Sequence, residues 1–139
     1  MNANIFFDVI CNAVEVLGIK TYLGKRPQAT TKNLDCFLVV ALPSRITDKE
    51  IGGCNSDFNW SETTAVFELF VRDDVQADNP IEAAIIELND KVEELKALFP
   101  IADLEQEVEV CRPRVIFTGK SDGNGFHYTR VHAQLSTMV

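Results

Sequence analysis

The chain has 139 residues, of which 46% are hydrophobic, and its net charge is −8. A chain of this length fits one domain, residues 1–139, which can bury a core without a metal ion or a disulfide. The acidic charge repels phosphate, which disfavours a protein that coats nucleic acid without specificity.

The N-terminal third of the sequence predicts one helix and two strands. Apolar residues recur at three- and four-residue steps over residues 4–17, and Gly18 can supply a left-handed end to this helix. Residues 19–24 predict a short strand. After a polar turn or exposed loop over residues 25–33, the nearly continuous apolar run of residues 35–42 predicts a strand that is covered on both faces.

Residues 44–60 have no hydrophobic period and contain several glycine and asparagine residues. We expect a long loop here, and loops of this length in compact domains are usually functional or mobile. Phe58 and Trp60 flank its end. Such aromatic rings can fix a loop onto the core or contact a partner. The first role is the more common one, and Trp60 also remains a candidate contact residue.

The middle of the chain predicts a strand and then a helix. Residues 62–72 alternate in the manner of a strand with two different faces. Asn79 and Glu82, with Pro80 between them, are typical of a helix N-terminus. We expect the helix that follows to cover the sheet with one apolar stripe. The stripe consists of Ile81, Ala84, Ile85, Leu88, Val92, Leu95 and Phe99.

The C-terminal part predicts a long hairpin. Its strands are residues 105–118 and 126–138, and a glycine-rich tip joins them. Pro113 cannot donate a ladder hydrogen bond, so it marks a sheet edge or a bulge. The element order is α-β-β-β-α-β-β, with about five strands joined largely by hairpins. This order predicts an α+β fold in which two helices pack on a predominantly antiparallel sheet.

The sequence shows no recognisable catalytic or cofactor-binding constellation. Gly119-Lys120-Ser121 resembles the end of a phosphate-binding loop, but Arg114 stands where that motif needs a glycine and no helix is expected to follow. His127 and His132 fall on opposite faces of one strand, so they cannot both bind one metal ion without a distortion. We therefore expect no enzyme activity, no metal and no cofactor.

Three weaker chemical signals have ordinary interpretations that we favour. The cysteines form no C-x-x-C pair and are expected to be buried free thiols. His127 could act as a base toward Cys54, but no third group that would orient the histidine is evident. Asp73 and Asp74, with Asp78, indicate a solvated turn rather than a cation site. The four cysteines are Cys11, Cys36, Cys54 and Cys111.

The only basic cluster of this acidic chain falls on the terminal hairpin. Arg112 and Arg114 are expected on one face of a strand, Lys120 at its tip and Arg130 on the return strand. These charges can be solvated or paired with the glutamates of the same strand. Alternatively, they form a contact surface for a protein partner or for duplex phosphate.

The hairpin is also too long for two modest helices to cover its tip. We expect Val115 and Phe117 to face one way, with Phe126 and Tyr128 adding aromatic surface nearby. Exposed apolar strands with unpaired edges are a liability unless another chain pairs with them or covers them. We therefore expect Phe126→Asp to weaken self-association and to leave the fold intact. The candidate contact residues are Phe126, Tyr128, Arg112, Arg114 and Trp60.

The pattern as a whole is similar to bacteriophage tail terminator proteins, the small subunits that cap a tail tube, and to related prophage neck proteins. The likeness is one of element order and length, and it spans nearly the whole chain. An N-terminal helix and a strand come first. The segments that then carry it are Cys36 to Leu42, Ala65 to Arg72, Asn79 to Leu98, and a terminal hairpin that includes Phe126 to Val131.

The resemblance implies a homo-oligomeric ring, often hexameric, that joins the tail tube to the head connector and lets DNA pass through its lumen. The partners would be further copies of the chain, tail-tube proteins and head-connector proteins. An acidic lumen suits that passage because it does not grip phosphate, so no specific nucleic-acid binding is expected. The family has no catalytic residues to carry over.

Two other interpretations remain open: a small ligand-binding or hydrolytic α+β domain with a pocket beside residues 44–60, and an accessory subunit of a larger complex. The apolar start lacks a basic segment and is interrupted by Asp8 and Glu15, unlike a signal peptide. No stretch approaches the roughly 20 apolar residues that cross a bilayer. We expect a soluble cytoplasmic protein without membrane contact, incorporated into the virion if it is phage-derived.

Overall fold

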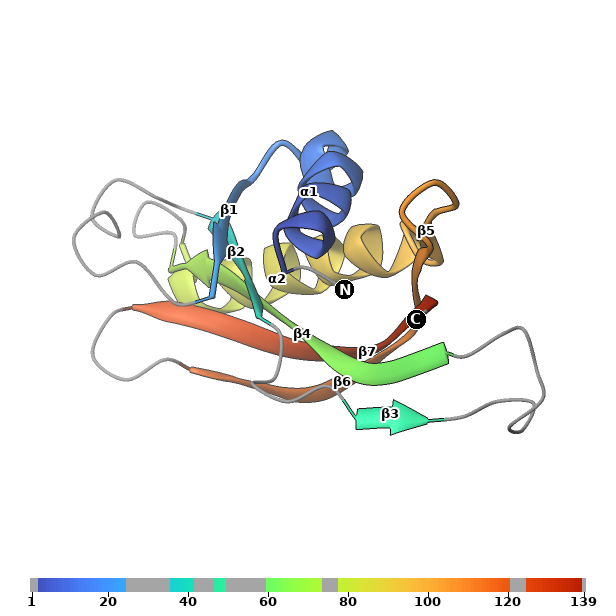
Figure 1. Cartoon of the computed structure of the whole chain (residues 1–139). Coiled ribbons are helices and arrows are strands. Elements are labelled where there is room, and N and C mark those ends of the chain that lie inside the picture. The colour runs from blue at the N-terminus through green and yellow to red at the C-terminus, as the bar shows by residue number, and fades with distance from the viewer. Residues whose placement is uncertain are drawn as a thin grey trace.

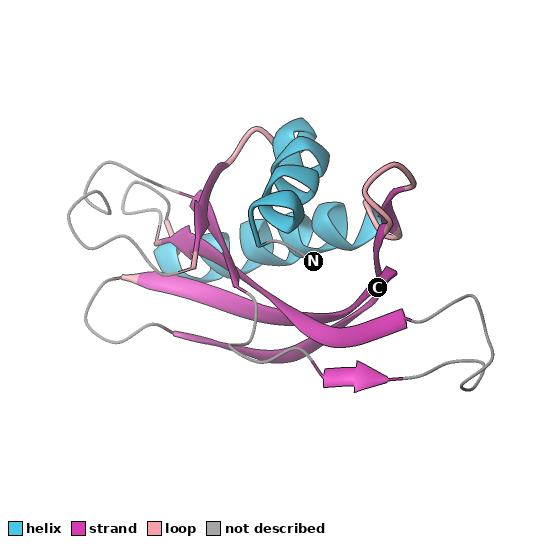
Figure 2. Ribbon diagram, in the orientation of Figure 1, coloured by secondary structure: helices cyan, strands magenta, loops and turns pink. Residues whose placement is uncertain are grey.

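The protein has an α+β fold in which two helices lie on one side of a curved, mostly antiparallel sheet (Figures 1 and 2). The computed structural model describes residues 3–24, 36–41, 47–49, 60–73, 78–120 and 125–138. The helices are α1 (Ala3–Val14), which a 3₁₀ turn (Glu15–Leu17) continues, and α2 (Pro80–Ala97). The strands are β1 (Lys20–Leu23), β2 (Cys36–Ala41), β3 (Thr47–Lys49), β4 (Trp60–Arg72), β5 (Ile101–Asp103), β6 (Val108–Lys120) and β7 (Phe126–Met138).

The sheet order is β1-β2-β4-β7-β6-β5, and β3 pairs with the start of β4. The prediction of about five strands was too low, because β3 and β5 have three residues each and are too short to show a hydrophobic period. The expectation of hairpin connections was wrong for β1 and β2, which are parallel. Parallel neighbours need a crossover rather than a tight turn. The connecting residues 25–35 lie outside the described part of the chain.

Both helix boundaries follow the expected local chemistry. Gly18 adopts the left-handed conformation (φ 67°) and its N–H donates to the Glu15 carbonyl, which ends the first helical segment. At the start of α2, the Asn79 side-chain oxygen accepts from the Glu82 N–H at 3.4 Å. The Asn79 amide in turn donates to the Glu82 carboxylate at 3.0 Å. These caps satisfy backbone groups that have no partner within the helix.

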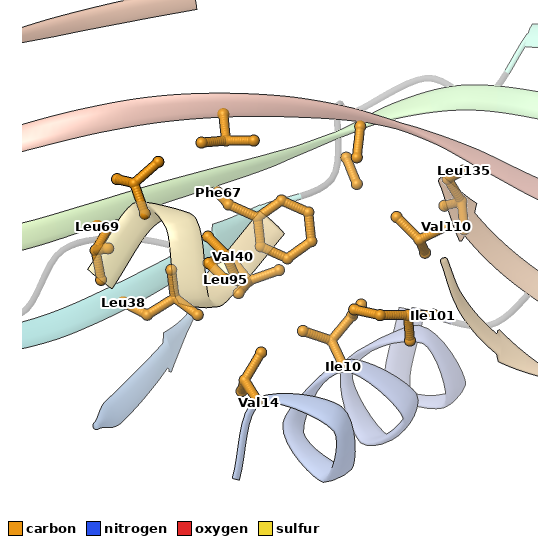
Figure 3. Packing of buried hydrophobic residues seen from close by; sticks show 14 of the residues in the cluster. Ile10, Val14, Leu38, Val40, Phe67, Leu69, Leu95, Ile101, Val110 and Leu135 are labelled. Carbon is orange, nitrogen blue, oxygen red and sulfur yellow. The ribbon is translucent and has the colours of Figure 1, made fainter. Parts of the chain in front are cut away.

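The main core lies between the helices and the sheet (Figure 3). Alternate residues of β4 point toward it, because successive side chains of a strand face opposite sides. Phe67 and Leu69 belong to the same buried cluster as Leu95 of α2 and Ile10 of α1. The buried side chains that line it from β4 are Ala65, Phe67, Leu69 and Val71.

A second, smaller cluster lies on the face of the sheet that is turned away from the helices, here called the outer face. Phe37 of β2 stacks on Phe70 of β4 with ring centroids 4.6 Å apart, and Phe126 of β7 meets Phe37 edge-on at 5.3 Å. All three side chains are at most 2% exposed. The expectation that β2 is covered on both faces is therefore confirmed, since Phe37 faces outward and its neighbour Leu38 faces the helices.

The apolar stripe of α2 is only partly buried. Leu88 and Leu95 are fully buried, but Ile81 is 49% exposed and Ile85 is 40% exposed. The prediction that the whole stripe packs on the sheet was therefore wrong at the N-terminal turns of the helix. Val16, placed on the apolar face of the first helix, is likewise 76% exposed because the chain has tightened into a 3₁₀ turn there.

Leu88→Ala is expected to lower the free energy of unfolding by about 2–5 kcal/mol, through lost burial and the cavity it leaves. Ile86→Ala is a matched control on the same helix, because Ile86 is 55% exposed. Its effect should stay within about 0.5 kcal/mol. Urea denaturation followed by circular dichroism measures both. Equal midpoints for the two variants would contradict the placement of Leu88 in the core.

Candidate functional site

Five side chains on the outer face, contributed by β6 and β7, form what we call the outer surface. They are Arg112, Arg114, Phe117, Tyr128 and Arg130. Three of the five candidate contact residues belong to this set. The surface is basic, whereas the chain as a whole carries a net charge of −8.

Two irregularities in β6 place these residues together. The β6–β7 register shifts between Cys111 and Arg114 and again between Val115 and Phe117, so β6 carries one extra residue at each point. Pro113 lies in the first shift, which confirms that it marks a bulge. The backbone of Arg112 is left-handed there (φ 55°).

The first bulge keeps both arginines on the outer face. The Arg112 guanidinium donates to the Gln134 side-chain oxygen at 3.3 Å, and Arg114 pairs with His132 across the ladder. Gln134 and His132 are alternate residues of β7, so they share a face. The prediction that Arg112 and Arg114 lie on one face therefore agrees with these contacts.

The second bulge separates two residues that were expected to face the same way. Val115 pairs with Val131, which belongs to the main core, whereas Phe117 pairs with Arg130 and lies 5.6 Å from the Tyr128 ring on the outer face. The Phe117 ring lies directly over Gly119, where a Cβ atom would come within 2.6 Å of a ring carbon. Gly119, which has no Cβ atom, therefore leaves the space that this ring occupies.

The charges of the outer surface are only partly compensated. Arg130 donates to the Glu68 carboxylate of β4 at 3.3 Å, and both side chains are partly exposed. Burial lowers the pKa of His132 below its usual value, and the nearby charges of Arg130 and Arg114 lower it further. The other glutamate described on this face, Glu109, is exposed beside Ser136 at the opposite end of β6.

The edge of the sheet beside this surface is open within the described residues. β5 pairs with β6 only at residues 108–110, and no other described strand pairs with the far side of residues 111–120. Three consecutive apolar residues here are exposed by nearly half: Val115 (46%), Ile116 (48%) and Phe117 (49%). An edge of this kind can pair with another chain.

Phe126, Tyr128 and Trp60 are the candidate contact residues other than the two arginines. Phe126 was expected to be exposed, but it is 2% exposed beneath the Arg72 guanidinium, 4.9 Å from its ring centroid. The expectation that Phe126 adds exposed surface was therefore wrong, and Phe126→Asp is now expected to destabilise the fold, because a carboxylate there would be buried among aromatic rings. Tyr128 is partly buried and stacks on Phe70 at 5.3 Å. Trp60 begins β4, but its side chain lies outside what the structure describes.

His127 has a partner that sequence reasoning missed. Its Nε2 lies 2.6 Å from an Asp73 carboxylate oxygen, and the Asp73 N–H donates to the Gly125 carbonyl. Asp73 was interpreted as part of a solvated turn, since nothing in a single sequence shows that residues 54 positions apart meet. The pair joins the end of β4 to the start of β7. His132 lies on the opposite face, as expected.

The described residues hold no cluster of histidine, cysteine, aspartate or glutamate side chains suited to a metal ion. Within the described residues, Cys11, Cys36 and Cys111 form no disulfide with one another, and they are partly exposed rather than buried as predicted. Cys54 and most of the segment 44–60 lie outside the described part of the chain, together with any pocket beside that segment.

Comparison with known proteins gives no match of this sequence to a family model or to a curated protein. Among the described residues, none of the helices combines the length and the apolar character that crossing a bilayer requires.

The pKa of the His132 imidazole is expected to lie below its usual value of 6.5, and Arg114→Gln should raise it by removing a neighbouring positive charge. Since the folded protein disfavours protonated His132, the unfolded chain takes up the proton first as the pH falls through 6.5. The stability that this residue contributes therefore decreases toward lower pH. An NMR titration of the histidine ring resonances measures the pKa. Lys96→Gln, on α2, is the control and should leave it unchanged.

Proposed function

We propose that this chain is a structural assembly subunit of a phage or prophage tail, and that it works as a tail terminator does. In this proposal, several copies form a ring, hexameric in the arrangement that the resemblance implies. The ring caps the tail tube and joins it to the head connector. The partners are further copies of the chain, tail-tube proteins and head-connector proteins.

The observation that carries the proposal is the outer surface beside the open part of β6. A basic surface with a half-exposed aromatic ring, Phe117, stands out on a chain with a net charge of −8. Arginine and aromatic residues are the types that contribute most to binding at protein interfaces. The neighbouring edge offers backbone groups to a further strand.

The bulges of β6 favour a specific contact over indiscriminate edge pairing. A regular exposed edge is a template for aggregation, and natural sheets interrupt such edges with bulges, prolines and charged residues. Residues 111–117 contain two register shifts, Pro113 and two arginines. These features leave only short stretches that another chain can pair with, so side-chain contacts on the outer surface would select the partner.

The unmutated protein is expected to associate in a concentration-dependent way, and Phe117→Asp should weaken that association by about tenfold or more because it replaces an apolar contact with a charge. Sedimentation velocity from micromolar to millimolar concentration measures the effect. Leu104→Asp is the matched control, since Leu104 is an exposed apolar residue (91%) in the turn after β5. The control variant should associate like the unmutated protein.

The same preparations should be tested for binding to purified tail tubes and connectors of the phage or prophage whose genes adjoin this one. A single monomeric species at millimolar concentration, together with no binding to tubes or connectors, would refute the proposed function.

A further inference from the structure

The N-terminal half of α2 carries a second exposed apolar group, on the other side of the sheet from the outer surface. Ile81, Ile85 and Ile86 are 49%, 40% and 55% exposed. Ile81 and Ile85 are four residues apart, the spacing that brings side chains together on a helix, and Ile86 follows Ile85 directly, on a neighbouring part of the helix surface. We call these three residues, with the exposed acidic residues around them, the α2 surface.

The α2 surface is acidic. The helix carries Glu82, Glu87, Asp90, Glu93 and Glu94 against Lys91 and Lys96, and all five acidic residues are exposed. Both lysines are already engaged by glutamates of the same helix, Lys91 with Glu94 at 3.6 Å and Lys96 with Glu93 at 3.8 Å. Among the described residues of the helix, Glu82, Glu87 and Asp90 have no such lysine partner, so the exposed isoleucines share the helix surface with an excess of negative charge.

The two surfaces lie on opposite sides of the sheet. The buried face of α2 packs on the side of β4 and β7 that carries Phe67 and Val131. Phe117 contacts Tyr128, which points the other way. The outer surface combines half-exposed Phe117 with an excess of positive charge, and the α2 surface combines exposed isoleucines with an excess of negative charge.

We propose that the α2 surface of one copy docks on the outer surface of the next, so that the subunits join head to tail. This inference rests on the proposed function and names the contact through which the copies assemble. Glutamates and Asp90 of one copy face Arg112 and Arg114 of its neighbour, while the isoleucines pack against Phe117. Complementary charge of this kind selects the partner and its orientation.

The charges also argue against the alternative, a twofold contact in which a surface meets itself. If the outer surfaces of two copies met, their guanidinium groups would face each other. If the α2 surfaces of two copies met, their carboxylates would face each other. Like charges that face each other across an interface are costly. A contact between two different surfaces generates a ring when the rotation between subunits closes, and a filament when it does not.

The size of the molecule allows both contacts at once. A standard interface takes about 800 Å² from each partner, roughly a tenth of the 8545 Å² that the chain exposes. Because the two surfaces lie on opposite sides of the sheet, one copy can engage two neighbours without overlap.

The test uses two full-length variants, each with one surface disabled. Phe117→Asp removes the apolar centre of the outer surface, and Ile85→Gln with Ile86→Gln removes that of the α2 surface without adding charge. All three positions are at least 40% exposed, so both variants should fold. Unfolding midpoints check this. Sedimentation should show that each variant alone associates about tenfold or more weakly than the unmutated protein.

An equimolar mixture of the two variants should form a dimer and nothing larger, because each retains the surface that the other lacks. Association of the unmutated protein should also weaken as salt concentration rises. The exposed charge variants Arg114→Glu and Asp90→Lys, one on each surface, should weaken association as well. They provide a second measurement if an apolar variant fails to fold.

Three outcomes overturn the inference. In the first, the variant with Ile85→Gln and Ile86→Gln assembles like the unmutated protein while Phe117→Asp does not. The copies then assemble through a different contact, and the proposed function is retained. In the second, the mixture of variants forms no dimer, which shows that the outer surface and the α2 surface do not bind each other. In the third, the unmutated protein is monomeric alone and does not bind tail tubes, which removes the proposed function and this inference with it.

Discussion

The pairing of β4 with β7 is the constraint on which the rest of the structure depends. The ladder runs without a shift from Trp60 opposite Met138 to Arg72 opposite Phe126. Because side chains alternate along a regular ladder, it fixes two faces at once: Phe67 and Val131 meet the helices, while Phe70 and Tyr128 face outward. A shift by one residue would exchange the faces, exposing the core and burying Glu68 and Arg130 under the helices.

β6 departs from this regularity, and its departures create the candidate site. Next to the regular β7, each bulge changes which side chains of β6 share a face with their neighbours. The first bulge brings Arg112 to Gln134, and the second turns Phe117 outward while Val115 stays on the helix side. Strand irregularity here determines surface chemistry, whereas the unshifted ladder of β4 and β7 determines which of their side chains enter the core.

Local patterns were sufficient to predict the helices, the α2 cap and five of the seven described strands, because each depends on residues close in sequence. Contacts between distant residues were not predictable in the same way. The pairing of His127 with Asp73 depends on the β4–β7 register. The burial of Phe126 depends on Phe37 and Arg72, which come from other strands. For the candidate site, arginine spacing indicated a shared face correctly, but the bulge between Val115 and Phe117 has no signature in the sequence.

The exposed isoleucines of α2 show how a wrong prediction about folding can carry information about assembly. The periodicity of the helix places Ile81 and Ile85 in its core stripe, yet each remains at least 40% exposed, since the stripe continues beyond what the sheet covers. Exposed apolar groups of this kind, bordered by polar residues, are a mark of interaction sites. In the proposed contact a neighbouring copy covers these residues, which would bury the stripe along its length and account for a hydrophobic period that extends beyond the sheet.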